Sequence, residues 1–147
     1  MYSRCNTCWR SNKGQVPSNK NPADGSDGQD KPRDLVRRTF EFALRVRRFV
    51  NRLPRTLANI EDGRQLVKAS GSVAANYLEA QEALSRKDFF YRIKICRKES
   101  RESNLWLRLV DYGDDAALDA ERAGMANEAD ELKRIFSSIA GKEGNEA

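Results

Sequence analysis

The stretch Ser70–Phe90, SGSVAANYLEAQEALSRKDFF, is central to the fold because one amphipathic helix ends within it and another begins. Apolar positions recur at spacings of four and three residues up to Ala83, which marks one buried helical face. Ser85 starts a new helix, with Asp88 three residues later in a capping-box-like arrangement. A solvated helix does not require the small residues at the start of this stretch. They therefore indicate a helix packed closely against a neighbour.

A tight turn before Ser85 places the two helices side by side, so that residues whose numbers add up to about 170 face each other. Ser70 is then expected near Ser100, where small residues meet small residues. Gly63 and Gly71 each cost about 1 kcal/mol in a helix interior relative to alanine, which a helix tolerates where a neighbouring backbone comes close. We expect a close crossing of these two helices with a few buried hydroxyl groups.

The same periodicity extends in both directions along the chain. It predicts helices from Asp34 to Leu53, from Thr56 to Ala83, from Ser85 to about Gly113 and from Ala126 to Ala140, with a loop that could include a short helical turn at Asp114–Gly124. No strand pattern and no internal repeat is found. Four helices with short connections predict an all-α protein, an antiparallel up-and-down four-helix bundle.

Composition divides the chain into three parts. Residues 1–33 are rich in Asn, Ser, Gly, Asp and Lys and are predicted to be a disordered N-terminal extension. Residues 34–141 form the predicted bundle, and residues 142–147 are predicted to fray. No apolar run is long enough for a membrane span or a secretory signal, so we expect a soluble cytoplasmic protein without a membrane partner.

The residue types exclude several kinds of chemistry. The chain has no histidine, which removes the commonest general base and metal ligand. Cys5 and Cys8 have the spacing of half a zinc site, but only Cys96 remains elsewhere, at an apolar helical position typical of a small core residue. No nucleotide-binding glycine motif occurs. We predict no catalytic residue, no metal site and no cofactor, hence no enzyme.

Positive charge is concentrated in the first three predicted helices. Residues 1–112 carry a net charge of +10 and residues 113–147 a net charge of −5. Arginine predominates among these bases, and it pairs with phosphate in a bidentate manner. The residues predicted to contact nucleic acid are Arg37, Arg38, Arg45, Arg48, Arg92, Lys94, Arg97, Lys98 and Arg101. The alternative is a solvated surface with pairs such as Lys98 and Glu102.

Asn76 lies on the apolar stripe of the second helix. The simplest interpretation is a buried amide satisfied within the bundle, which could fix helix register or oligomeric state. Glu99 and Glu102 flank the seam of the third helix and are expected to pair with arginine across a helix or subunit boundary. A catalytic or ligand role is the alternative for Asn76.

Three segments together resemble a known family. SVAANYLEA (Ser72–Ala80), RKESRESNLWLRLV (Arg97–Val110) and NEADELKRIFSSI (Asn127–Ile139) resemble conserved stretches of the four-helix-bundle proteins related to those encoded in intervening sequences of bacterial large-subunit rRNA genes. Phe89 matches the aromatic residue that opens the third helix of that family. The likeness covers about Asp34 to Ala140; Ala80 departs from the usual glycine, and residues 1–33 match nothing.

This resemblance implies a bundle that assembles into a ring-like homopentamer. The accessory variability determinant of diversity-generating retroelements is similar, and it binds nucleic acid and a reverse transcriptase through a basic surface. Carried over, the structural or interface positions are Ser72, Asn76, Glu79, Phe89, Glu99, Glu102, Trp106 and Leu107. The implied partners are further copies of the chain, RNA or DNA, and a reverse transcriptase or another protein.

Two functions therefore remain open from the sequence. The first is a non-enzymatic homo-oligomeric bundle that binds RNA or DNA electrostatically, with little sequence specificity, through arginine-rich helix faces. The second is an assembly or adaptor module in which the charges serve only solubility and subunit pairing.

Overall fold

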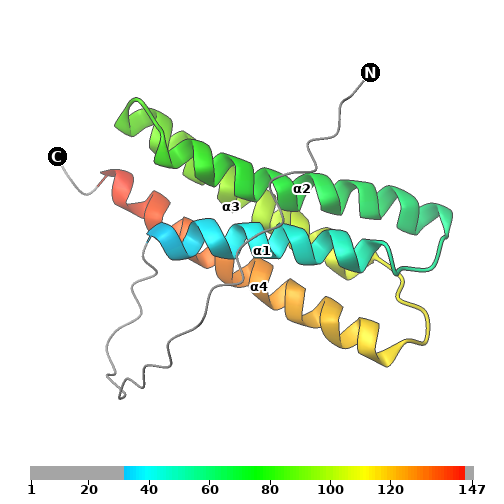
Figure 1. The fold of residues 1–147 in the computed structure, drawn as a ribbon. Helices are drawn as coiled ribbons and strands as arrows, with labels where there is room; N and C mark the ends of the chain where they lie inside the picture. Colours follow the sequence, from blue (N-terminus) through cyan, green and yellow to red (C-terminus); the bar gives the residue numbers. More distant parts are fainter. Residues whose placement is uncertain (1–31, 145–147) are drawn as a thin grey trace, which may run out of the picture.

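The computed structural model describes residues 32–144, and within this range the chain is all-α (Figure 1). The elements are α1 (Pro32–Val50), α2 (Leu57–Gln81), α3 (Arg86–Leu109), α4 (Ala116–Ala140) and a 3-10 turn, η1 (Gly141–Gly144). The four helices pack against one another, which confirms the prediction of an all-α, four-helix protein. Residues 1–31 and 145–147, and with them most of the predicted N-terminal extension, lie outside the described residues.

Three helices begin at side chains that cap their first turn. Thr56 accepts a hydrogen bond from the Asn59 N–H at 3.1 Å, and Ser85 accepts one from the Asp88 N–H at 3.1 Å. Such caps satisfy backbone donors that lack a partner in the first turn. The predicted restart at Ser85 is therefore confirmed, and it fixes the turn between α2 and α3.

The start of α4 differs from the sequence prediction. The sequence predicts a loop over residues 114–124, but Asp115 caps a helix that begins at Ala116, accepting from the Leu118 N–H at 2.9 Å. Alanine has the highest helix propensity, and one interior glycine costs only about 1 kcal/mol, so Gly124 does not end the helix. Leu118 and Met125 are buried and extend the stripe of the predicted helix by two turns.

The core lies between the inner faces of the four helices. Its largest fully buried side chains include Phe42 and Phe49 of α1, Leu66 of α2, Ile93 and Leu107 of α3, and Leu132 and Phe136 of α4. The most extensive packing is between α2 and α3 and between α3 and α4, whereas α1 packs on α2 and more lightly on α4. No helix within residues 32–144 combines the length and apolar character needed to cross a membrane.

Contacts between α2 and α3 follow the predicted register. The Cys96 thiol donates to the Val73 carbonyl at 3.5 Å, and Arg92 donates to Asn76 at 3.2 Å, so the paired residue numbers add up to 169 and 168. The seam contains Ser70, Ser100 and Ser103, each with an exposed fraction of 0%. Each hydroxyl donates to a carbonyl three or four residues earlier in its own helix. The buried hydroxyl groups are confirmed.

The two glycines of α2 face a different neighbour. A Cβ added at Gly63 would lie 2.8 Å from Cγ1 of Val50, and one at Gly71 would lie 3.0 Å from the Arg47 guanidinium. Both contacts are with α1 rather than with α3. The glycines therefore permit α1 to approach α2, and small serines rather than glycines line the seam between α2 and α3.

Candidate nucleic-acid interface

Arg38 of α1 lies against the acidic surface of α4. Its Nε donates to Glu128 at 2.6 Å, its Nη2 donates to the second oxygen of Glu128 at 3.1 Å, and it also pairs with Glu131. Only 23% of the Arg38 side chain and 21% of Glu128 are exposed. Bidentate arginine–carboxylate pairs are among the stronger charged contacts. Arg38 therefore joins two helices of the bundle.

Two further arginines follow Arg38 at intervals of seven residues, Arg45 on the same face of α1 and Arg52 in the turn after the helix. Arg52 pairs with Glu121 of α4, and the Arg45 guanidinium would lie 3.9 Å from a Cβ added at Gly124. Glu121, Glu128 and Glu131 thus form an acidic row on α4 that pairs with Arg38 of α1 and with Arg52 of the turn after it. The basic N-terminal part and the acidic C-terminal part of the sequence are thus joined, in part, by ion pairs with α4.

The other predicted contact residues of α1 lie on its exposed surface. Arg37 donates to Glu41 at 2.8 Å, and this hydrogen bond raises the pKa of the Arg37 side chain. Arg48 is exposed, and its guanidinium has no hydrogen bond or ion pair with any residue that the structure describes. Arg48 therefore differs from Arg37 and Arg38, because no carboxylate of the described chain neutralises it.

In the first half of α3 the predicted contact residues are also engaged. Arg92 pairs with Glu79 at 2.5 Å and donates to the Asn76 side-chain oxygen, so it links α3 to α2. Lys94 pairs with Glu143 of η1 at 2.5 Å. These two cations contribute to packing between elements, and their charge is largely neutralised.

The second half of α3 differs because its arginines are exposed and their guanidinium groups have no partner within the described residues. Arg97, Arg101 and Arg108 are exposed, and their side chains form no hydrogen bond or ion pair with any of residues 32–144. Their spacing of four and seven residues places them on one face of the helix. With Lys98, they form what we call the α3 basic stripe. Lys98 is 3.6 Å from Glu102, the only carboxylate that pairs with the stripe within the described chain.

A groove lies beside part of the α3 basic stripe, from Lys98 to Arg108. Its volume is about 460 Å³, and it is lined by Lys98, Arg101, Glu102, Asn104, Leu105 and Arg108. Three cations and one exposed leucine along a single helix provide both charge and apolar contact. The cations could contact the charged groups of a polyanion, and the leucine could contact apolar groups that lie between those charges.

Five of the eight residues predicted to be structural occupy three environments. Leu107 is fully buried, and Phe89 and Trp106 pack partly buried against the core. Asn76 is only partly buried, and its amide nitrogen donates to the Ser72 carbonyl at 2.9 Å and to the Ser72 hydroxyl at 3.1 Å. Asn76 is thus satisfied within α2 and by Arg92 of α3. Whether any of these residues lies at a subunit interface stays a prediction.

Sequence periodicity missed the buried amide that joins the two loops at one end of the bundle. Asn59 has an exposed fraction of 4%. It donates to the Pro54 carbonyl at 2.9 Å and to the Asp111 carbonyl at 2.8 Å, and it accepts from the Asp111 N–H at 2.9 Å. The signal available was a polar residue three positions after a capping threonine, which periodicity assigns to an outer face.

The described residues offer no site for a metal ion. No group of three or more cysteine, aspartate or glutamate side chains within residues 32–144 could hold one. Cys96 is fully buried, which confirms its predicted place in the core, and burial raises the pKa of its thiol to about 12. Such a thiol stays protonated and unreactive at neutral pH. Cys5 and Cys8 lie outside the described residues.

Glu99 provides a prediction for the pH dependence of stability. Burial, followed by the neighbouring charge of Glu102, raises the pKa of the Glu99 carboxyl. When folding raises the pKa of a carboxyl group, that group favours the folded state at pH values below its pKa in the unfolded chain, which is about 4.3. This contribution to stability is lost as the pH rises through the pKa of the folded state. We expect Glu99→Gln to stabilise the protein at pH 7 by less than about 1 kcal/mol, since the group is partly solvated.

Urea unfolding at pH 7 and at about pH 4 measures this effect, and the gain should shrink at the lower pH. Glu61→Gln, at an exposed position of α2, is the matched control. A loss of stability in Glu99→Gln at pH 7 would show that contacts of the carboxylate with Ser72 and Lys68 outweigh its desolvation.

Comparisons with known proteins agree with this architecture. A family model described as "23S rRNA-intervening sequence protein" matches residues 32–138. A solved structure from Bacteroides thetaiotaomicron, described as a protein of unknown function from the S23 ribosomal protein family, is similar with a TM-score of 0.60 and 26% sequence identity. The match covers 72% of this chain and 97% of that one. No curated protein matches the sequence. The chain belongs to the 23S rRNA-intervening sequence protein family.

Proposed function

We propose that this chain is a non-enzymatic, cytoplasmic bundle of antiparallel helices that binds the backbone of RNA or DNA through the α3 basic stripe. The bundle acts as a homo-oligomer, a pentameric ring, so that several copies of the stripe engage one nucleic acid. A reverse transcriptase or another protein is a candidate partner of the assembly. The observation that carries the proposal is the set of arginines on one face of α3 that no carboxylate among residues 32–144 neutralises.

The distribution of ion pairs supports α3 rather than α1 as the contact surface. Arg38 and Arg52 would have to leave carboxylates of α4 in order to bind phosphate. Arg97, Arg101 and Arg108 have no such bonds to break within the described residues. An arginine side chain without an ion pair binds phosphate at a lower free-energy cost than a paired one, because no contact has to be broken first. Its guanidinium is also weakly hydrated and always charged.

Charge reversal in the α3 basic stripe tests the proposal. We expect the double variant Arg97→Glu/Arg101→Glu to bind a generic RNA or DNA duplex at least about tenfold more weakly, since two attractive phosphate interactions become repulsive. The slope of log affinity against log salt should also become shallower by about 0.9 for each phosphate that is no longer neutralised. Fluorescence anisotropy with labelled duplexes at several salt concentrations measures both quantities.

The control keeps the same change in net charge away from the stripe. Arg64 of α2 and Arg134 of α4 are exposed and unpaired within residues 32–144, so Arg64→Glu/Arg134→Glu is the matched variant. It should retain most of the affinity. Equal reductions in the two variants would mean that net charge alone attracts nucleic acid, and affinity that is insensitive to salt would contradict an electrostatic mode.

The second candidate function is assembly without nucleic acid. It is favoured by exposed apolar side chains, notably Phe40 with an exposed fraction of 61% and Leu109 with 54%. Exposed residues of this size are candidates for burial between subunits. Native mass spectrometry of Arg97→Glu/Arg101→Glu separates the two functions. A persistent oligomer that no longer binds nucleic acid supports the first, and dissociation of the oligomer supports the second.

A further inference from the structure

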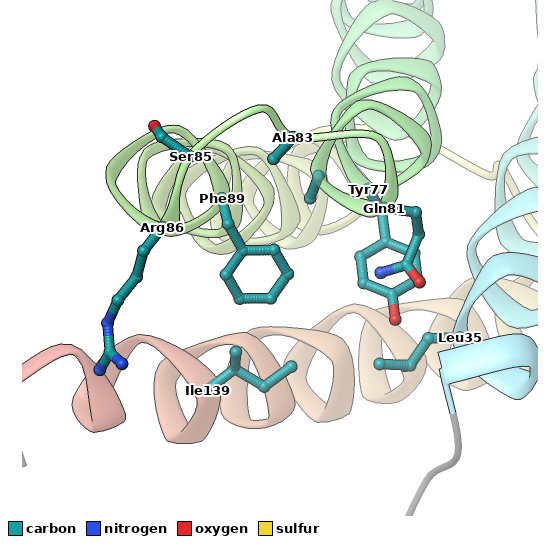
Figure 2. Close-up of a pocket in the computed structure, with 9 residues that line it drawn as sticks. Leu35, Tyr77, Gln81, Ala83, Ser85, Arg86, Phe89 and Ile139 are labelled. Atoms are coloured by element: carbon teal, nitrogen blue, oxygen red, sulfur yellow. The ribbon is translucent and has the colours of Figure 1, made fainter. Parts of the chain in front are cut away.

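A groove opens at the end of the bundle where α1 begins (Figure 2). Its volume is about 590 Å³, and its apolar part is lined by Leu35 of α1, Tyr77 of α2, Phe89 of α3 and Ile139 of α4. A second hollow of about 330 Å³ shares Phe89 and Ile139 with it and reaches η1. We call the two hollows together the end groove. It offers apolar surface from all four helices to another molecule.

The charged residues that line the end groove, among those that the structure describes, are both basic. Arg86 belongs to both hollows, and Lys142 of η1 belongs to the second. Arg86 lies 5.2 Å from the centre of the Phe90 ring and donates to the Lys142 carbonyl at 3.3 Å, so contacts with α3 and η1 hold it in place. A fitting occupant is therefore apolar where it enters the groove and carries a carboxylate beside this basic rim.

The turn between α2 and α3 presents an apolar side chain next to the end groove. Leu84 lies between Ala83 and Ser85, which both line the groove, yet the Leu84 side chain itself is 100% exposed. Within residues 32–144 no other large hydrophobic side chain is exposed to this extent. Leu84 therefore contributes no packing to its own chain, and its apolar surface is free to contact another molecule.

A carboxylate lies two residues before Leu84. Glu82 is the C-cap residue of α2 and is exposed, and its side chain forms no hydrogen bond or ion pair with any of residues 32–144. The turn thus carries an apolar group and a carboxylate close together. These are the two features that an occupant of the end groove requires, and they lie at the same end of the bundle as the groove.

We propose that two copies of the chain associate end to end, each inserting Leu84 into the end groove of the other. The leucine then contacts Phe89 and Ile139 of the second copy, and Glu82 lies against the basic rim of that copy at Lys142. Leu84 and the end groove are side by side on one end of the bundle. A two-fold axis that passes between them therefore allows both insertions at once, which makes the contact isologous and closed.

Charge favours a second copy over the first residues of the same chain. Residues 1–31 contain five Lys or Arg and three Asp, a net charge of +2, which has the same sign as the rim. Glu82 has the opposite sign. The end-to-end contact also differs from the ring of the proposed function, because it joins copies in pairs. It requires neither the ring nor nucleic acid.

The affinity of the contact depends on how many copies make it together. A contact built around one leucine and one carboxylate from each copy is small beside the roughly 1,000 Å² expected of a stable interface. Two single chains joined in this way should therefore dissociate on dilution. Where each partner is itself an oligomer, several contacts form in parallel and the association is much tighter. In either case the joined particle has twice the mass of its halves.

Leu84→Asp in the full-length chain tests the proposal. The substitution should leave folding unchanged because Leu84 is fully exposed, and circular dichroism verifies this. We expect sedimentation velocity to show a particle of half the wild-type mass. The association should weaken at least about a hundredfold, since symmetry removes the burial of two leucines at once. The matched control is Leu57→Asp, at a 79% exposed position where α2 begins, and it should keep the wild-type mass.

A charge exchange tests the pairing at the rim. Glu82→Lys and Lys142→Glu should each weaken the end-to-end association about tenfold, because two-fold symmetry then creates two contacts between like charges. The double variant Glu82→Lys/Lys142→Glu restores opposite charges across the contact, and its affinity should return to within about threefold of the wild type. Sedimentation at several protein concentrations measures the dissociation constant of each variant.

Three results would overturn the end-to-end contact. The first is a wild-type particle whose mass Leu84→Asp leaves unchanged. The second is an equal loss of association in Leu84→Asp and Leu57→Asp, which would assign it to exposed apolar surface in general. The third is a double charge variant that associates no better than the single ones, which would contradict the two-fold arrangement. A ring or nucleic-acid binding that fails its own test leaves these comparisons unaffected, because they concern only the doubling of mass.

Discussion

Asn59→Ala is expected to lower the free energy of unfolding by about 2–3 kcal/mol, although Asn59 lies outside the apolar stripes. The side chain is 4% exposed and makes three hydrogen bonds, two to the Asp111 backbone and one to the Pro54 carbonyl. Each such bond contributes about 1 kcal/mol, and the groups left behind have no replacement partner. Urea unfolding followed by circular dichroism at 222 nm measures the change.

The matched control for this prediction is Asn76→Ala in the same helix. Asn76 is only partly buried, so water can replace its hydrogen bonds, and we expect a loss of about 1 kcal/mol or less. Equal destabilisation of the two variants would contradict the prediction. That outcome would mean that the amide joining the two loops contributes no more than one facing the surface.

Ser100→Leu is expected to cost about 2–3 kcal/mol of stability. Ser100 has an exposed fraction of 0% at the seam between α2 and α3, where Ser70 and Ser103 are equally buried. A leucine needs space that the opposite helix occupies, and overpacking of this kind forces side chains out of their preferred rotamers. Thermal unfolding with parallel urea titrations measures the destabilisation.

Ser100→Ala separates size from the hydroxyl group. The Ser100 hydroxyl donates to the Cys96 carbonyl of its own helix, which already takes part in helical hydrogen bonding. Removing it should cost less than about 1 kcal/mol, because the higher helix propensity of alanine offsets part of the effect. If Ser100→Ala destabilises the protein as much as Ser100→Leu, the hydroxyl rather than the small volume is required at the seam.

The helices of this protein could be predicted where the apolar period is strong and a capping residue precedes it. Ser85 and the stripe after it mark the start of α3. The start of α4 could not be predicted in the same way, because the apolar residues between Asp115 and Ala126 are mostly alanines and their stripe is weak. There, helix propensity and the burial of Leu118 outweigh the loop-like character of an acidic segment that contains glycine.

The candidate interface was predictable in composition but not in detail. The sequence shows many arginines on the first and third helices, and it cannot show which of them face carboxylates. Arg38 and Arg101 are both arginines on charged helices, yet the first joins α1 to α4 and the second is unpaired within the described chain. The acidic row of α4 causes this difference, and it is brought alongside α1 only by folding.

Local sequence was sufficient to specify a helical chain, the position of the turn between α2 and α3, and the small residues that line the seam between them. These properties follow from periodicity, capping and residue volume, which depend on neighbours along the chain. Three other features emerge only when the helices are packed: Gly63 and Gly71 face α1, Asn59 joins two loops, and some arginines are left unpaired among the described residues. Each of these depends on distances between segments far apart in sequence, which no local pattern encodes.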